Sequence, residues 1–245
     1  MQIQNYWSTL EQKMNDFPPK RKSDRTRASL KIATAKLLDR VGYRDMTITD
    51  ITKTAGLGRA SFHDYFENRT QITKEIMIEF VGLVEGTKPP PQSQSNIFTN
   101  MYYANKAVIS IFQANSGLMR CLFQLGDQDK EFNDLCRKMN LTWYKNVANT
   151  ISDRRRIKTS KPLTFLTIYS LGGMIDEFMR GLYVYNDTEV LEILKDHGIE
   201  NNALAYYFAI IWYRAIFAKD PDDIPQEVDP KIIQLFADEL GMGVF

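Results

Sequence analysis

The sequence predicts an all-α protein, in which an N-terminal three-helix domain with a helix-turn-helix is joined to a larger C-terminal helical domain. Apolar residues recur at three- and four-residue steps along nearly the whole chain, and no run alternates as a half-buried strand would. Two short helical patterns are separated by a glycine turn, and a proline-rich stretch interrupts the pattern farther on. The hydrophobic content of 44% and the charged content of 25% over 245 residues are ordinary for a folded protein.

Residues 1–22 are expected to form a poorly specified N-terminal extension that ends, after two prolines, in three consecutive cations. A first helix is expected after Ser23, because serine is a favoured N-cap residue. Gly42 is expected to end this helix, since glycine commonly follows the last helical turn. The apolar residues between them fall on one helical face: Leu30, Ala33, Leu37, Leu38 and Val41.

A helix-turn-helix is predicted next. Thr47 and Asp50 have the spacing of a capping box, which indicates the start of a short second helix. Gly56 follows closely and can adopt the positive φ that lets the chain reverse within a few residues. A third short helix is expected over about 59–65, and a fourth over about 68–85.

The clearest break in the helical pattern lies at 88–95, where three consecutive prolines precede a polar tail. We therefore expect an N-terminal extension over 1–22, a helix-turn-helix domain over 23–88 and a C-terminal domain over 89–245. The C-terminal helices are expected over about 96–114, 117–125, 129–155, 162–184, 188–196, 201–218 and 230–239.

Charge is distributed unevenly along the chain. Between Lys20 and Arg69 there are twelve Lys or Arg residues and six Asp or Glu residues, a net charge of +6. The remaining residues carry −5, because the whole chain carries +1. A basic block joined to an acidic remainder indicates that the N-terminal part meets a polyanion.

Several classes of protein are excluded by what the sequence lacks. Two cysteines and two distant histidines give no metal-ligand or disulfide spacing, so no cofactor or metal is expected. No nucleophile–base arrangement or phosphate-binding glycine loop is present, so the chain is not expected to be an enzyme. The N-terminus does not read as a secretory signal, and the most apolar stretch, 203–218, is too short for a membrane span and contains Arg214. The protein is therefore expected to be cytoplasmic, without a membrane partner.

The outward face of the third predicted helix carries small and polar side chains, which suit an element that enters the major groove of double-stranded DNA. The sequence GLGRASFHDYFENRTQI, preceded by TITDITKTA, resembles the DNA-binding domain of the tetracycline-repressor (TetR) family. The resemblance covers about residues 24–80. It implies an all-α homodimer that binds DNA and regulates transcription, with a divergent C-terminal domain that binds a small effector.

The resemblance also assigns roles to individual positions. Arg59 matches the leading turn of the recognition helix and is the best candidate to read guanine through two hydrogen bonds. Arg69 stands where the family usually has lysine, at the start of the fourth helix, and would bind phosphate. His63 and Gly58 depart from the tyrosine and serine common at those positions. The full set of expected DNA contacts is Thr47, Thr49, Arg59, Ala60, Ser61, His63, Tyr65 and Arg69.

The C-terminal half is rich in aromatic residues and methionine, which form either ordinary core or the lining of an effector pocket. The candidates for a pocket that takes a small hydrophobic effector are Tyr102, Phe112, Trp143, Met174 and Phe178. The homodimer interface is expected on the helices near 163–184 and 201–218, the first of which contains Gly172-Gly173.

Two functional hypotheses follow from these features. In the first, the protein is a repressor that a small hydrophobic effector releases from a palindromic operator. In the second, it is a DNA-bound adaptor of the same fold whose C-terminal domain engages a protein partner. A third element is left open: Lys20, Arg21 and Lys22 form either a flexible arm along the DNA backbone or a solvated tail.

Overall fold

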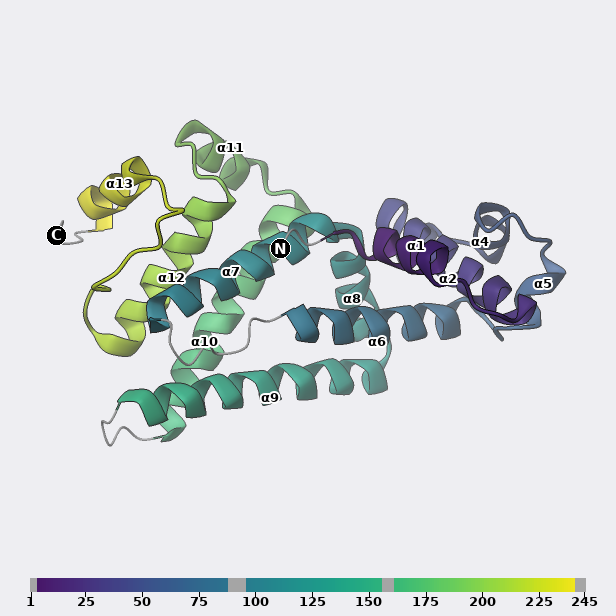
Figure 1. Ribbon diagram of the computed structural model, residues 1–245, viewed down its shortest axis with the longest axis horizontal. Coiled ribbons are helices and arrows are strands. Elements are labelled where there is room, and N and C mark those ends of the chain that lie inside the picture. The colour runs from purple at the N-terminus through teal and green to yellow at the C-terminus, as the bar shows by residue number, and fades with distance from the viewer. Residues whose placement is uncertain (1–3, 88–95, 156–160, 241–245) are drawn as a thin grey trace. The chain divides into compact units, whose positions relative to one another are not determined.

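The computed structural model describes residues 4–87, 96–155 and 161–240 (Figure 1). These ranges consist of helices and connecting segments and contain no strand, which confirms the predicted all-α fold class. Two compact units are present. The first comprises residues 1–87 with 111–136, and the second comprises 88–110 with 137–245. The predicted boundary at 88 falls outside the described residues, so the proposed division into domains stays a prediction.

The first unit is built around one long central helix. Its helices are α1 (Tyr6–Asp16), α2 (Lys22–Arg40), α3 (Gly42–Asp45), α4 (Ile48–Thr54), α5 (Ala60–His63), α6 (Arg69–Thr87) and α8 (Ser116–Gln128). Helix α2 contacts α1, α4, α6 and α8 and so forms the centre of this unit. The core is formed by completely buried apolar side chains, among them Leu30, Leu38, Ile51, Phe62, Ile72, Ile76, Phe80 and Leu118.

Within the N-terminal extension, residues 6–16 form a packed helix, which was not predicted. Asn5 caps α1 by accepting a hydrogen bond from the backbone N–H of Trp7 at 3.0 Å. The Asn5 amide also donates to the carbonyl of Ala114 at 2.8 Å, and the backbone N–H of Tyr6 donates to Asn115 Oδ1 at 2.7 Å. Helix α2 begins at Lys22 with Arg21 at the N-cap position, so the expectation of a Ser23 cap was wrong.

The second unit consists of longer helices. It contains most of α7 (Ile97–Ala114) and α9 (Lys130–Arg155), then α10 (Lys161–Arg180), the π-helical turn η1 (Gly181–Tyr185), α11 (Thr188–Asp196), α12 (Asn201–Phe217) and α13 (Pro230–Leu240). Helix α12 is the most buried of these, and its apolar side chains include Ala205, Tyr206, Phe208, Ile210 and Trp212. These side chains therefore pack within the subunit, although the sequence predicts that this helix contributes to the dimer interface.

Gly172 has a packing role inside the second unit. A Cβ atom built on Gly172 would lie 2.3 Å from the ring of Tyr144 on α9, so a larger residue there would force this ring to move. Gly173 has open space within 4 Å and is exposed. Only the second of the two adjacent glycines therefore remains available on the surface of α10.

The C-terminal helices match the sequence prediction closely. Helix α11 spans 188–196 as expected, and α7 and α12 agree within one residue at each end. Helix α8 extends past the expected 125 to Gln128. No helix among the described residues has the length and apolar character needed to cross a bilayer.

Candidate nucleic-acid interface

Helices α4 and α5 form a helix-turn-helix whose geometry follows from a few residues. The Thr47 hydroxyl accepts a hydrogen bond from the backbone N–H of Asp50 at 3.1 Å, and the Asp50 carboxylate accepts one from the N–H of Thr47 at 3.0 Å. This reciprocal pair is the predicted capping box, which satisfies two backbone donors at the start of α4. The hydrogen bonds from the Thr47 side chain and backbone lower the pKa of Asp50 below its ordinary value.

The turn after α4 uses glycine as the sequence predicts. Gly56 has a φ of +69°, and its N–H donates to the carbonyl of Lys53 at 3.2 Å. The N–H of Leu57 donates to the carbonyl of Thr52 at 2.9 Å, which completes a Schellman-type ending. A side chain at position 56 would be strained in this backbone conformation.

Helix α5 is shorter than predicted but is held firmly against the core. It spans Ala60–His63, and Arg59 occupies the N-cap position. Phe62 is completely buried and its ring centroid lies 5.8 Å from that of Phe66. This aromatic contact anchors the back of α5, so the other side of the helix faces solvent.

The expected DNA contacts divide by exposure. Thr47, Thr49, Arg59, Ala60 and His63 are exposed, whereas Ser61 and Tyr65 are partly buried. The hydroxyl of Thr47 is committed to the capping box, since it also donates to the Asp50 carboxylate at 2.6 Å. The exposed members lie on the helix-turn-helix itself, which is the arrangement that reading a groove requires.

Arg69 is oriented differently from the phosphate contact that the sequence suggests. Its guanidinium donates to the carbonyl oxygens of Arg44 at 3.2 Å and of Met46 at 2.5 Å. It also lies over the ring of Tyr43, 4.6 Å from the centroid. Arg69 therefore connects the start of α6 to the segment just before α4, a contact that depends on tertiary structure and leaves no signal in the local sequence.

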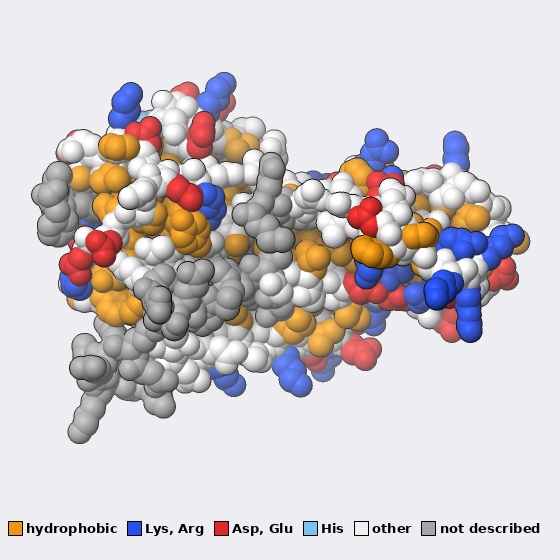
Figure 2. Space-filling view, viewed as in Figure 1, with side chains coloured by type: hydrophobic (Ala, Val, Ile, Leu, Met, Phe, Trp, Pro, Cys, Tyr) orange, Lys and Arg blue, Asp and Glu red, His pale blue; other side chains and the backbone are white. Residues whose placement is uncertain are grey.

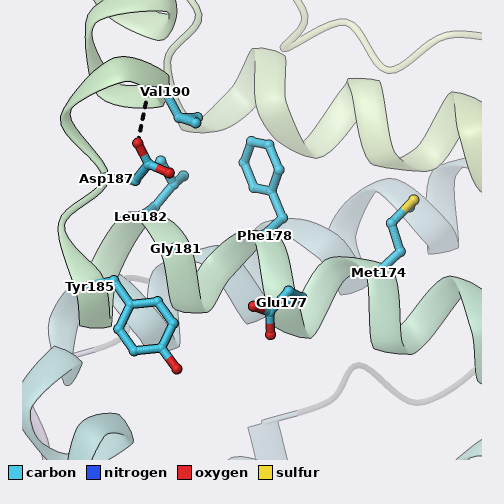
Figure 3. Close-up of a pocket in the computed structure, with 8 residues that line it drawn as sticks. All are labelled: Met174, Glu177, Phe178, Gly181, Leu182, Tyr185, Asp187 and Val190. Atoms are coloured by element: carbon cyan, nitrogen blue, oxygen red, sulfur yellow. Dashed lines mark hydrogen bonds between the residues drawn. The ribbon is translucent and has the colours of Figure 1, made fainter.

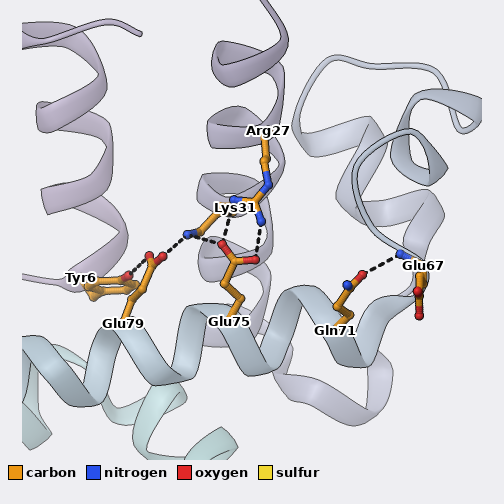
Figure 4. Close-up of polar contacts among 7 residues, drawn as sticks. All are labelled: Tyr6, Arg27, Lys31, Glu67, Gln71, Glu75 and Glu79. Atoms are coloured by element: carbon orange, nitrogen blue, oxygen red, sulfur yellow. Dashed lines mark hydrogen bonds and ion pairs between the residues drawn. The ribbon is translucent and has the colours of Figure 1, made fainter.

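Ion pairs and hydrogen bonds connect α2 and α1 to α6 in the first unit. Arg27 and Lys31 on α2 bind Glu75 on α6, with distances of 2.8 and 3.0 Å to its Oε1, and Lys31 also pairs with Glu79 (Figure 4). Glu79 in turn accepts a hydrogen bond from the Tyr6 hydroxyl at 3.2 Å. Burial alone would raise the pKa of Glu75, but the hydrogen bonds from Arg27 and Lys31 lower it.

By contrast, several other cations of this unit form no ion pair within the ranges that the structure describes: Lys20, Arg21, Lys22, Arg40, Arg44, Lys53 and Arg59. Figure 2 shows blue side chains gathered at the end of the first unit that carries α5. Lys53 and Arg44 were not among the expected contacts, although the excess of positive charge in this part of the sequence pointed to them. The unpaired charge gives this surface the sign that a phosphate backbone requires.

The five expected effector residues lie in different surroundings. Tyr102 is completely buried on α7, and burial raises the pKa of its phenol to about 12. Phe112 belongs to the first unit, while Trp143 packs near Trp212 with ring centroids 6.5 Å apart. Only Met174 and Phe178 line the hollow described next.

A hollow of about 500 Å³ lies on the surface of the second unit around Gly181 (Figure 3). Its lining is contributed by Met174, Glu177, Phe178, Gly181, Leu182, Tyr185, Asp187 and Val190. Phe178 makes an edge-to-face contact with Phe208 on α12, at 5.2 Å between ring centroids, which fixes the apolar side of the hollow. Within the described residues, no group of three or more His, Cys, Asp or Glu side chains is placed to hold a metal ion.

Comparison with known proteins agrees with this geometry. Residues 32–76 match the family described as bacterial regulatory proteins, tetR family. No curated protein matches the chain.

Solved structures of low sequence identity share the fold. A transcriptional regulator from Rhodococcus sp. RHA1 has a TM-score of 0.60 and 12% identity, over 84% of this chain and all of that one. A TetR-family transcriptional regulator from Bordetella parapertussis has a TM-score of 0.56 and 15% identity, covering 76% and 93% of the two chains. A fatty acid degradation regulator from Bacillus halodurans has a TM-score of 0.54 and 15% identity, covering 78% and 95%.

Proposed function

We propose that this chain, a DNA-binding transcriptional regulator of the tetR family, is a homodimeric repressor that a small hydrophobic effector releases from a palindromic operator. The observation that carries the proposal is the α4–α5 helix-turn-helix, whose capped start, glycine turn and buried aromatic back leave Arg59 and Ala60 exposed at the leading end of α5. A recognition helix held in this way enters the major groove with its N-terminal residues against the base edges.

Arg59 is the residue that we propose reads the sequence. It is exposed and forms no ion pair within the described part of the first unit. A guanidinium in that state can donate two parallel hydrogen bonds to the O6 and N7 atoms of guanine. Thr49 and His63, also exposed, would bind phosphate or a neighbouring base edge.

The outer face of α10 supports the proposal of a dimer. Its exposed apolar side chains include Leu163, Leu166, Tyr169 and Met174, with exposed fractions between 37% and 65%. These positions recur at steps of three to five residues, so they lie on neighbouring faces of one helix. A second copy of the same helix would cover them in a two-fold contact, and Gly173 leaves room for close approach.

The hollow around Gly181 is the site that we propose for the effector, because Met174, Phe178, Leu182 and Val190 give it an apolar lining. Small-molecule sites are concave and mostly apolar, with a few polar groups that orient the ligand. The carboxylates of Glu177 and Asp187 are the polar groups in this lining. The effector is therefore expected to be small and hydrophobic.

Selection of DNA fragments by the purified full-length protein at near-physiological salt tests the proposal. Enrichment of one palindromic motif is the expected result, and the Arg59→Ala variant should enrich it poorly. Uniform, salt-sensitive retention without a motif would overturn the proposal of a specific regulator. For the effector, apolar compounds that raise the melting temperature of wild-type protein should do so less for Phe178→Ala, since a ligand stabilises only the state that binds it.

A further inference from the structure

The turn between α1 and α2 carries an aromatic ring and a run of cations that the helix-turn-helix does not use. The side chain of Phe17 is 78% exposed, the largest value among the exposed apolar side chains of the described ranges. Two prolines follow it, and then the exposed cations Lys20, Arg21 and Lys22. The sequence left open whether these cations form a flexible arm or a solvated tail.

The structure holds this turn in place on both sides. The Arg25 guanidinium donates to the carbonyl oxygens of Pro19 and Lys20, each at 3.0 Å. Each proline fixes its own φ, which removes further freedom from the turn. On the other side, α1 is anchored by the buried Tyr6. A surface that is ordered before binding loses less conformational entropy when it meets a partner.

The charge of the turn is strongly positive and not neutralised. Residues 17–25 contain four cations and one acid, Asp24, so their net charge is 4 − 1 = +3. Lys20, Arg21 and Lys22 form no ion pair in the part of the chain that the structure describes. The neighbouring cations Arg27 and Lys31, one and two turns farther along α2, are both paired with glutamates of α6.

The start of α2 also lies next to the recognition helix. The guanidinium of Arg27 lies over the ring of Phe66, 4.8 Å from its centroid. Phe66 contacts Phe62 of α5, with 5.8 Å between ring centroids. In Figure 2 the Lys and Arg side chains gather at this same end of the first unit. The basic turn and the helix-turn-helix are therefore close enough to meet one DNA duplex.

We propose that the turn 17–22 is a second DNA-contacting element, which binds the duplex beside the base pairs that the helix-turn-helix reads. Lys20, Arg21 and Lys22 bind backbone phosphates, and Phe17 packs against the deoxyribose edge of the neighbouring groove. Such contacts position the protein and add affinity without reading sequence. The proposal rests on the DNA-binding function proposed above and extends the interface beyond α4 and α5.

The test compares wild type with the variant K20A/R21A/K22A on duplexes that wild-type protein has selected from a random-sequence pool. One duplex ends at the selected motif, and another extends it by about one helical turn on each side. We expect wild type to bind the extended duplex more tightly, and the variant to lose this preference. The slope of log K against log salt is negative, and each lost phosphate contact makes it shallower by about 0.9, so the three substitutions should make it shallower by about 2.7 per chain.

A matched variant, R137A/K138A/K145A, removes three exposed cations from α9 and should leave both the preference and most of the slope unchanged. The turn would be excluded from the interface if the two triple variants behave alike, or if K20A/R21A/K22A retains the wild-type preference. Failure of wild type to select any motif would instead contradict the proposed function, so the two failures are distinguishable.

Phe17→Ala tests the apolar contact separately. The side chain is exposed, so its removal should leave the thermal unfolding curve unchanged. We expect a several-fold loss of affinity on the extended duplex, none on the trimmed duplex, and an unchanged salt slope. Equal affinity of Phe17→Ala and wild type on the extended duplex would remove the ring from the interface.

Discussion

Gly117 at the start of α8 lies directly against the backbone of Asp39 near the end of α2. A Cβ atom on Gly117 would lie 2.3 Å from the carbonyl oxygen and 2.4 Å from the Cα atom of Asp39. The Asp39 carboxylate accepts hydrogen bonds from the Asn5 amide at 3.0 Å and from the Trp7 indole at 3.2 Å. One point of the first unit thus brings together α1, α2 and α8.

The Gly117→Ala variant should destabilise the protein because the clashing atoms are backbone and cannot rotate away. We expect a loss of about 1–3 kcal/mol in the free energy of unfolding, as for other overpacked sites. Urea unfolding followed by circular dichroism measures it. Gly82→Ala on α6, where no atom lies within 4 Å of the new Cβ, is the control and should be neutral or stabilising. A variant Gly117→Ala as stable as wild type would show that α8 can shift away from α2.

Arg59→Ala should weaken binding to the selected motif far more than binding to random DNA. Loss of a two-bond contact to guanine costs about 1–3 kcal/mol of specific binding. Titration of both duplexes at one salt concentration gives the ratio of the two affinities. Lys53→Ala on α4 removes an equal charge from an exposed position and should weaken both duplexes alike. Equal losses for Arg59→Ala on both duplexes would remove it from the reading role.

Arg69→Ala should lower affinity for every DNA sequence alike, because the guanidinium fastens α6 to the carbonyls of Arg44 and Met46 before α4. Arg69→Lys should not restore the wild-type level, since an ammonium group cannot stack on the ring of Tyr43 as the planar guanidinium does. Hydrogen exchange of the α4 amides should be faster in both variants. Full rescue by lysine, with unchanged exchange, would instead support the phosphate contact suggested by the sequence.

Stability should fall in acid through the network around Glu75. The pKa of Glu75 is lowered in the folded protein from its ordinary value of 4.5. The ionised carboxylate therefore stabilises the fold at pH values above 4.5. This contribution is lost as the pH falls through that value toward the folded-state pKa. Urea midpoints between pH 7 and pH 3.5 should fall less steeply for Glu75→Gln than for wild type. Glu192→Gln at an exposed position of α11 should follow wild type, and identical profiles for Glu75→Gln and wild type would contradict the role of the network.

The fold was largely predictable because its signals are local. The threonine–aspartate capping box and Gly56 fix the helix-turn-helix from adjacent residues, and apolar periodicity locates the C-terminal helices. The helix α1 was missed, although Asn5 followed by Tyr6, Leu10 and Met14 offered a cap and apolar residues at helical spacing.

The site was predictable in part only. The resemblance identified residues of α4 and α5 that are exposed, because the outward face of a short amphipathic helix follows from its sequence. The inward position of Arg69 depends on Tyr43, 26 positions away, and local sequence cannot show it. The effector candidates show a second limit of local sequence, since aromatic content does not distinguish core from pocket: Tyr102 and Phe112 are both buried.

The first compact unit contains residues 111–136 as well as 1–87. Leu118, Cys121 and Leu125 of α8 are buried within it, so a fragment cut after residue 87 would lack a share of its own core. The unit that carries the helix-turn-helix is thus not one continuous segment of the chain. A chimeric regulator that exchanges this unit for another must transplant both segments, with three junctions instead of one.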